Sequence, residues 1–236
     1  MSIFRFKQFE VDQTSCAMKI NTDGVLLGAL AGANHPETIL DVGTGKGVIA
    51  LMMAQRFPNA KIDALEIDPL CADTAGKNFK NSSFSDCLTI YKASFQNFLD
   101  ANPEKRYDLI ISNPPFFIDS LKPTDPEMER AKHTDKSFFA ELAHYVSMHL
   151  SSNGTFWVIL PHTTADLLKD IMQGTNVGLA NTTTIHSFID SDPHRELLAF
   201  NKRGSYENFE KFVIYHTKKE YSSQYKKAMR SFLTIF

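Results

Sequence analysis

Short apolar runs alternate with amphipathic stretches along most of the chain. Strand-like runs occur at 38–42, 61–67, 88–91, 107–112, 155–160, 183–189 and 210–216. Between most of them, apolar residues recur with helical spacing. This alternation predicts an α/β fold with a doubly wound, mostly parallel, seven-stranded sheet. Residues 194–201 are a further strand candidate, so we expect either this run or 183–189 to be an extra edge element.

A glycine-rich loop follows the first predicted strand. The run 38–42 leads into Gly43-Thr44-Gly45-Lys46-Gly47, and a helical stretch follows. Glycines allow a ligand to approach the backbone where a Cβ would clash. A phosphate-binding P-loop requires Ser or Thr after Gly-Lys, and a nicotinamide fingerprint requires a glycine where Val48 stands. Neither alternative fits this loop.

The second predicted strand ends in acidic residues. Glu66 closes the run and lies 23 positions beyond Gly43, and Asp68 follows it. This spacing is typical of a carboxylate that binds the two hydroxyls of a ribose. The sequence therefore predicts a ribose contact at Glu66.

The fourth predicted strand, 107–112, runs directly into Asn113-Pro114-Pro115-Phe116. The Asn113 side-chain oxygen and the Pro114 carbonyl can accept the two hydrogens of a planar amine, whose lone pair is otherwise spread into its ring. Proline holds φ near about −65° and has no amide hydrogen, so the carbonyls stay fixed and free to accept. Phe116 is placed to stack on a nucleobase. The tetrapeptide is a candidate catalytic element.

The two elements together carry a resemblance to a known class of enzymes. Asp41-x-Gly43-x-Gly45-x-Gly47 resembles the first motif of S-adenosylmethionine-dependent methyltransferases. With Asn-Pro-Pro-Phe about 70 residues downstream, the chain resembles those that methylate N6 of adenine, N2 of guanine or the amide of glutamine. The stretches 9–13 and 18–28 resemble more closely the bacterial tRNA adenine N6-methyltransferases, which modify adenine 37 of a valine tRNA. The resemblance covers residues 4 to about 215.

The resemblance implies a class I, Rossmann-like fold, S-adenosyl-L-methionine as cofactor and tRNA as partner. It places Asn113, Pro114 and Phe116 at the target base. It places the following residues at the cofactor: Lys19, Thr22 and Asp23 at its methionine end, Asp41, Gly43 and Gly45 along it, Glu66 at its ribose, Asp68 just behind Glu66, and Asn113 in contact with the cofactor as well as the base. Related enzymes usually carry an acidic residue near the cofactor adenine, where this chain has Lys92-Ala93-Ser94. We expect Ser94 to replace it as a weaker acceptor.

Other activities remain open at this point. Glutamine methyltransferases of release factors usually carry Tyr in the aromatic place and a larger helical domain before the glycine loop, whereas about 40 residues precede it here. Guanine N2-methyltransferases of rRNA use the same tetrapeptide, often after a longer N-terminal half. A non-catalytic RNA module that only binds the cofactor is disfavoured, because both Glu66 and Asn113 are present.

Length and composition agree with one enzyme domain. The chain has 236 residues, 43% of them apolar and 22% charged, which is enough for one α/β core. We expect residues 1–37 to cover the cofactor and residues 38–236 to form the catalytic core.

The sequence has no apolar run of about 20 residues and no signal-peptide core, so we expect a cytoplasmic protein without membrane contact. Three cysteines without metal-ligand spacing predict reduced thiols and no metal.

Positive charge is concentrated at the end of the chain. The net charge is −2, yet residues 195–236 carry nine basic and four acidic groups, whereas residues 30–194 carry a net charge of −7. We expect a phosphate track beside the pocket, formed by Arg195, Lys202, Arg203, Lys218, Lys219, Lys226, Lys227 and Arg230. The segment 117–136 is expected to be a loop that orders on substrate binding, with His133 at the surface rather than in catalysis.

Overall fold

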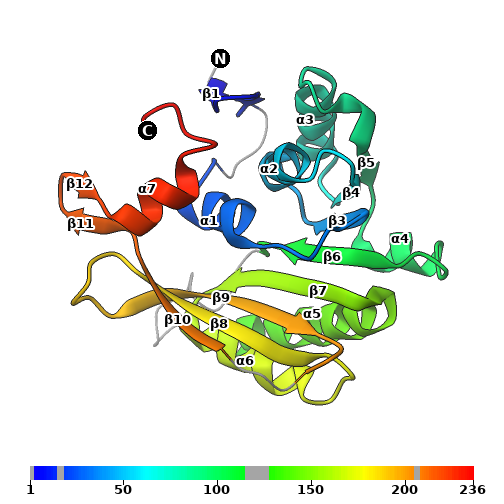
Figure 1. Cartoon of the computed structure of the whole chain (residues 1–236). Coiled ribbons are helices and arrows are strands. Elements are labelled where there is room, and N and C mark those ends of the chain that lie inside the picture. Colours follow the sequence, from blue (N-terminus) through cyan, green and yellow to red (C-terminus); the bar gives the residue numbers. More distant parts are fainter. Residues whose placement is uncertain (1–2, 15–18, 115–127, 205–207) are drawn as a thin grey trace.

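The computed structural model describes residues 3–14, 19–114, 128–204 and 208–236, with the side chains of 128–135 excepted. A central sheet of eight strands runs through it in the order β10-β8-β9-β7-β6-β3-β4-β5 (Figure 1). Its strands are β3 (Thr38–Val42), β4 (Lys61–Glu66), β5 (Leu88–Lys92), β6 (Tyr107–Ser112), β7 (Leu150–Leu160), β8 (Gly178–His186), β9 (Pro193–Asn201) and β10 (Asn208–Val213). All neighbours are parallel except β9, which is antiparallel to β7 and β8. The predicted doubly wound α/β fold is confirmed.

The sheet has one strand more than predicted. Both ambiguous runs are strands, β8 and β9, and neither lies at an edge, because β9 inserts between β7 and β8. The edge strand on that side is β10, which pairs in parallel with β8. Sequence periodicity detects a strand but not its neighbours, so the edge was assigned to the wrong run.

Helices cover both faces of the sheet (Figure 1). One face carries α1 (Thr22–Leu30), α2 (Val48–Arg56), α3 (Pro69–Lys80) and α7 (Ser223–Met229). The other carries α4 (Phe95–Asp100), α5 (Met128–His149) and α6 (His162–Met172). A 3-10 helix spans Ser85–Cys87. Alternate residues of β6 enter the two cores: Leu109 and Ile111 face α1 and α2, and Ile110 faces α5.

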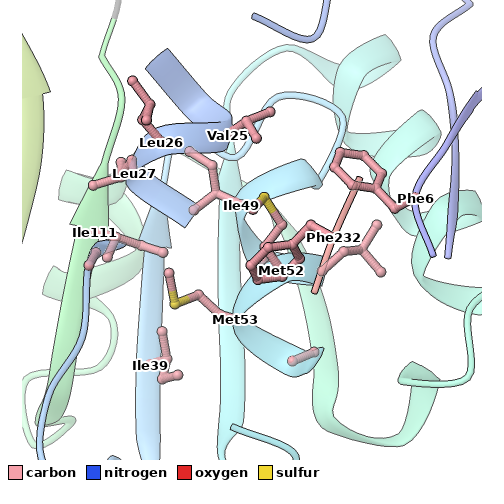
Figure 2. Close-up of a cluster of buried hydrophobic side chains, with 14 of the residues drawn as sticks. Phe6, Val25, Leu26, Leu27, Ile39, Ile49, Met52, Met53, Ile111 and Phe232 are labelled. Atoms are coloured by element: carbon pink, nitrogen blue, oxygen red, sulfur yellow. The ribbon is translucent and has the colours of Figure 1, made fainter. Parts of the chain in front are cut away.

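The two ends of the chain meet over the first of these cores. Two small hairpins lie there: β1 (Ile3–Arg5) with β2 (Glu10–Asp12), and β11 (Tyr215–Thr217) with β12 (Glu220–Tyr221). Figure 2 shows Phe6 and Phe232 packed beside Met52 of α2. The Lys7 amide donates to the Phe232 carbonyl at 2.7 Å. The final residues therefore hold the N-terminal segment against the core.

Three sequence-based expectations have different outcomes here. Cys71 is disulfide-bonded, so the expectation of reduced thiols is wrong for it, whereas Cys87 is a free thiol. Residues 128–136, expected to be loop, form the start of α5, because they continue the helical pattern of the residues after them. Within the described part of the chain, no helix is long and apolar enough to cross a membrane.

Candidate active site

The predicted motifs meet at the carboxyl edge of the parallel strands. The glycine loop follows β3, Glu66 ends β4 and Asn113 follows β6. In a doubly wound sheet this edge is where ligands bind. A pocket opens there whose described lining includes Lys19, Gly43, Gly45 and Asn113. The fold thus brings the predicted donor loop and the predicted catalytic residue into one pocket.

The glycine loop presents open backbone to this pocket. Gly43 and Gly45 have φ angles of 73° and 58°, in the left-handed region that side chains rarely adopt. A Cβ on either glycine would have no heavy atom within 4 Å. The Gly43 and Thr44 amides both donate to the Leu65 carbonyl, at 3.0 and 2.9 Å, which anchors the loop on β4. The loop is therefore a fixed cradle of the kind that an extended cofactor fits.

Glu66 is oriented before any ligand binds. Its Oε2 accepts from the Gly45 amide at 2.8 Å and its Oε1 from the Asp68 amide at 2.9 Å. A carboxylate has about four lone-pair sites, so two remain for the hydroxyls of a ribose. Asp68 caps α3 by accepting from the Leu70 and Cys71 amides. The Asp68 carboxylate is therefore engaged in capping α3, which fits the predicted position behind Glu66.

Asp41 lies beneath the glycine loop rather than at its surface. The residue is fully buried, and its Oδ2 accepts from the Thr44 hydroxyl at 2.6 Å. Burial raises its pKa to about 7, and the nearby Glu66 carboxylate acts in the same direction; hydrogen bonds from Thr44 and the Ala50 amide oppose the shift. Asp41 therefore shapes the loop from below.

Replacing Asp41 by asparagine is expected to flatten the pH dependence of stability between about pH 4 and pH 7. The folded-state pKa of about 7 exceeds the ordinary value of 3.8, so the folded protein binds more protons in this range and wild-type stability falls as pH rises. The unfolding free energy of wild type relative to the variant should fall by up to about 1.4 kcal/mol per pH unit. Urea unfolding of both proteins at pH 5, 6 and 7 measures it. A constant difference would contradict the pKa assignment.

Asn113 stands at the pocket wall with α1 against it. The preceding Ser112 is buried and donates to the Val42 carbonyl at 3.0 Å, which fixes the end of β6 beside β3. A Cβ on Gly24 would lie 3.6 Å from Asn113 Nδ2, an ordinary van der Waals separation, so the start of α1 packs directly beside the Asn113 side chain. Pro114 is buried. Phe116 lies outside the described residues, and its contact with the base stays a prediction.

The predicted methionine-end residues separate in space. Lys19 lines the pocket, whereas Thr22 and Asp23 are not among its described lining residues. Asp23 instead forms an ion pair with Arg195 of β9, with Nε and Oδ2 2.8 Å apart. This pair ties the start of α1 to the strand that lies two places from β6. Asp23 thus orients α1, and the pairing across 172 positions had no signal in the sequence.

Asn21 and Lys46 are among the pocket residues that the sequence analysis did not predict. Asn21 lines the pocket and caps α1, since its Oδ1 accepts from the Gly24 amide at 2.9 Å. An Asn before an apolar helix is a detectable capping signal. Lys46 also lines the pocket and is almost fully buried, and burial lowers the pKa of its ammonium. Asn78 donates to the Lys46 carbonyl at 2.9 Å and accepts from the Asp12 amide, linking the loop to β2.

Comparisons with known proteins show the family of this chain. The family model described as "Methyltransferase small domain" matches residues 20–181. A protein of Pedobacter heparinus named tRNA1(Val) (adenine(37)-N6)-methyltransferase is 46% identical over 99% of this chain and 98% of its own length. A protein of Haemophilus influenzae with the same name is 36% identical over the full length of both chains. This chain belongs to that methyltransferase family.

Solved structures give the same fold at lower identity. A predicted O-methyltransferase from Agrobacterium tumefaciens superposes with a TM-score of 0.68 at 17% identity and covers 89% of this chain and 96% of its own. TrmN from Thermus thermophilus gives a TM-score of 0.55 at 18% identity, over 70% of this chain and 44% of its own. These likenesses support the class I methyltransferase fold alone.

In this member of the tRNA1(Val) (adenine(37)-N6)-methyltransferase family, Ser94 is the residue predicted to contact the cofactor adenine. Ser94 caps α4, with its Oγ accepting from the Asn97 amide at 3.2 Å. Lys92 pairs with Asp73 at 2.5 Å and points its charge toward α3. Ser94 keeps one lone pair and its own hydrogen, so the predicted acceptor role stays a prediction.

The predicted phosphate track is not continuous. Lys202 and Arg203 lie at the amino end of β7, where they donate to the Leu150 carbonyl and to Asn153. Asn113 lies at the opposite, carboxyl edge of the parallel strands. Because β9 runs antiparallel to β7, the residues that follow β9 emerge at the amino edge, away from the site. Arg195 is paired with Asp23 and Lys226 with Glu220. The other four members, Lys218, Lys219, Lys227 and Arg230, are exposed. Charge counts along the chain could not reveal this division.

One cluster outside the pocket has metal-ligand chemistry. Ligand atoms of His162, Asp166 and Glu196 lie within 4.8 Å of one another. Lys169 makes ion pairs with Glu196 at 2.6 Å and with Asp166 at 3.2 Å, and the His162 ring contacts Glu196. The Lys169 ammonium pairs with both carboxylates and offsets one of their two negative charges, so a cation of the protein already serves the cluster.

Proposed function

We propose that this chain transfers a methyl group from S-adenosyl-L-methionine to the exocyclic N6 amine of adenine 37 in a valine tRNA. The observation that carries this function is the meeting of Asn113 with the open loop of Gly43 and Gly45 in one pocket. The names of the curated relatives support the choice of adenine 37 and valine tRNA, at up to 46% identity over nearly the whole chain.

The cofactor site is assigned to the loop and the strand ends around it. Gly43 and Gly45 present open backbone, Glu66 takes the ribose hydroxyls, and Lys19 and Asn21 lie at the methionine end. The bound cofactor supplies an electrophilic methyl group on a good leaving group, the sulphonium. The residues of this chain hold the two substrates in line and exclude water between them.

Asn113 and Pro114 position the adenine amine. The Asn113 Oδ1 and the Pro114 carbonyl accept the two amine hydrogens, which draws the nitrogen toward tetrahedral geometry and directs its lone pair at the methyl group. The buried Ser112 fixes the strand end that carries both acceptors. Phe116 is the proposed stacking partner of the base, an interaction worth about 1–3 kcal/mol.

The proposed reaction has no covalent enzyme intermediate and no protein base. The described pocket lining includes two lysines, Lys19 and Lys46, and neither a carboxylate nor a histidine. The proton released from the amine after transfer therefore passes to water. Bringing the adenine out of its stack costs less in a single-stranded anticodon loop than in a duplex.

The test is incubation of the protein with labelled S-adenosylmethionine and an unmodified valine tRNA transcript, followed by nucleoside mass spectrometry. N6-methyladenosine is expected with this transcript and not with one in which adenine 37 is replaced by guanine. Absence of product, with cofactor binding measured separately, would overturn the assignment. Ribosomal RNA and release-factor protein in parallel reactions would then identify the acceptor among the related activities.

A further inference from the structure

A second cavity, of about 300 Å³, adjoins the cofactor pocket. The two share Ile20 and Asn21 in their walls, so the segment before α1 separates them. Thr22, predicted at the cofactor, lines this second cavity instead. A ligand that spans both would pass over this short segment.

The walls of the second cavity come from opposite ends of the chain. Arg5 of β1 and Val25 of α1 contribute from the beginning, and Tyr221, Tyr225 and Leu233 from the end. Figure 1 shows the C-terminal segment beside β1, with α7 next to α1. Backbone contacts join the two ends, including the Phe6–Leu233 bridge. The cavity is therefore part of the folded core rather than a gap between loose ends.

Its aromatic wall is ordered in advance. Tyr221 stacks on Tyr225 with ring centroids 4.7 Å apart and on Tyr215 at 5.2 Å, and Phe236 meets Tyr221 edge-on. Burial raises the pKa of Tyr225 to about 12, so its hydroxyl stays protonated at neutral pH and can donate a hydrogen bond. An apolar wall with a few fixed polar groups suits a flat heterocycle with a polar edge.

The described lining of the cavity contains one charged side chain, a cation. Arg5 is in its lining, and the described lining residues include no carboxylate. Arg5 is paired with Glu10 at 2.7 Å, but the two side chains are 71% and 53% exposed, so this pair is weak and Arg5 can exchange Glu10 for a phosphate. Lys218 and Lys219 stand exposed at the turn between β11 and β12, and Glu220, which separates them from Tyr221, is paired with Lys226. These charges complement a phosphate-linked ligand.

We propose that this second cavity binds a nucleoside that neighbours the target adenine in the tRNA, with Arg5 on its phosphate. The inference rests on the proposed function: the two cavities share the wall formed by Ile20 and Asn21, and the nucleotide next to a base at Asn113 must lie near that base. Stacking and phosphate contacts would hold the anticodon loop open while the target base is extruded.

The direct test is photo-crosslinking. An anticodon stem-loop of the valine tRNA, with a photoreactive pyrimidine on either side of the target adenine, is irradiated with the protein, and the adducts are mapped by peptide mass spectrometry. Crosslinks from one of these positions to peptides 3–7 or 221–235 are expected. Methylation of the same RNA with crosslinks only elsewhere overturns the subsite and leaves the proposed function intact. Failure to bind or methylate the RNA overturns both.

Variants supply a second measurement. Arg5→Gln should weaken stem-loop binding several-fold. The slope of the logarithm of the binding constant against the logarithm of salt concentration should fall by about 1, as expected for the loss of one phosphate contact. Thr234→Trp, at an exposed lining position, should fill the cavity and raise the KM for RNA by about tenfold. S-adenosylmethionine affinity and melting temperature should stay unchanged in both. Arg203→Gln is the matched control, because Arg203 is an exposed arginine at the opposite edge of the sheet. Equal effects of Arg5→Gln and Arg203→Gln would contradict the subsite.

Discussion

Replacing Asn113 by alanine is expected to lower the turnover number for tRNA methylation by about 10²- to 10³-fold, a loss typical of removing one transition-state contact. The carboxamide would no longer accept from the amine, so the nitrogen lone pair would lose its direction toward the methyl group. Cofactor affinity should stay nearly unchanged, because the glycine loop and Glu66 are held by their own hydrogen bonds. Single-turnover kinetics and calorimetric titration of the cofactor measure the two quantities.

Asn97→Ala is the matched control, because Asn97 is an exposed asparagine on α4. It should leave both quantities unchanged. If Asn113→Ala reduced turnover and cofactor affinity by the same factor, Asn113 would be a structural residue of the pocket. The melting temperature of each variant separates these outcomes from loss of the fold.

Replacing Glu66 by alanine is expected to have the opposite profile. The variant loses the proposed contacts to the ribose, and the Gly45 and Asp68 amides lose their acceptor. Hydrogen bonds to charged groups contribute about 1.5–3 kcal/mol each, so the dissociation constant of S-adenosylmethionine should rise by at least about tenfold. Turnover at saturating cofactor should change much less, since Asn113 and Pro114 are untouched.

Glu37→Ala provides the comparison for Glu66→Ala. Glu37 is exposed just before β3, at the amino edge of the sheet, and its loss should leave cofactor binding as in the wild type. Cofactor binding of Glu66→Ala at wild-type affinity would remove the ribose assignment. Glu66→Gln keeps one acceptor oxygen for the backbone amides, so an intermediate affinity is expected for it.

Much of the site could be predicted from sequence because its residues follow strands directly. Gly43, Glu66 and Asn113 each stand at the end of an apolar run, and parallel strands bring such ends to one edge. Asp23 and Thr22 were harder to place, because they lie on a helix whose rotation depends on packing. The ion pair between Asp23 and Arg195 and the wall position of Thr22 are consequences of that packing.

The sequence by itself determined the alternating α/β pattern, the glycine loop and the strand-ending Asn113, because local spacing encodes each of them. Only the tertiary structure decided that β9 inserts between β7 and β8, that Lys202 and Arg203 face away from the site, and that the chain ends meet. These features depend on strand order and direction. Strand order results from long-range packing free energy shared among many residues, and no short stretch of sequence specifies it.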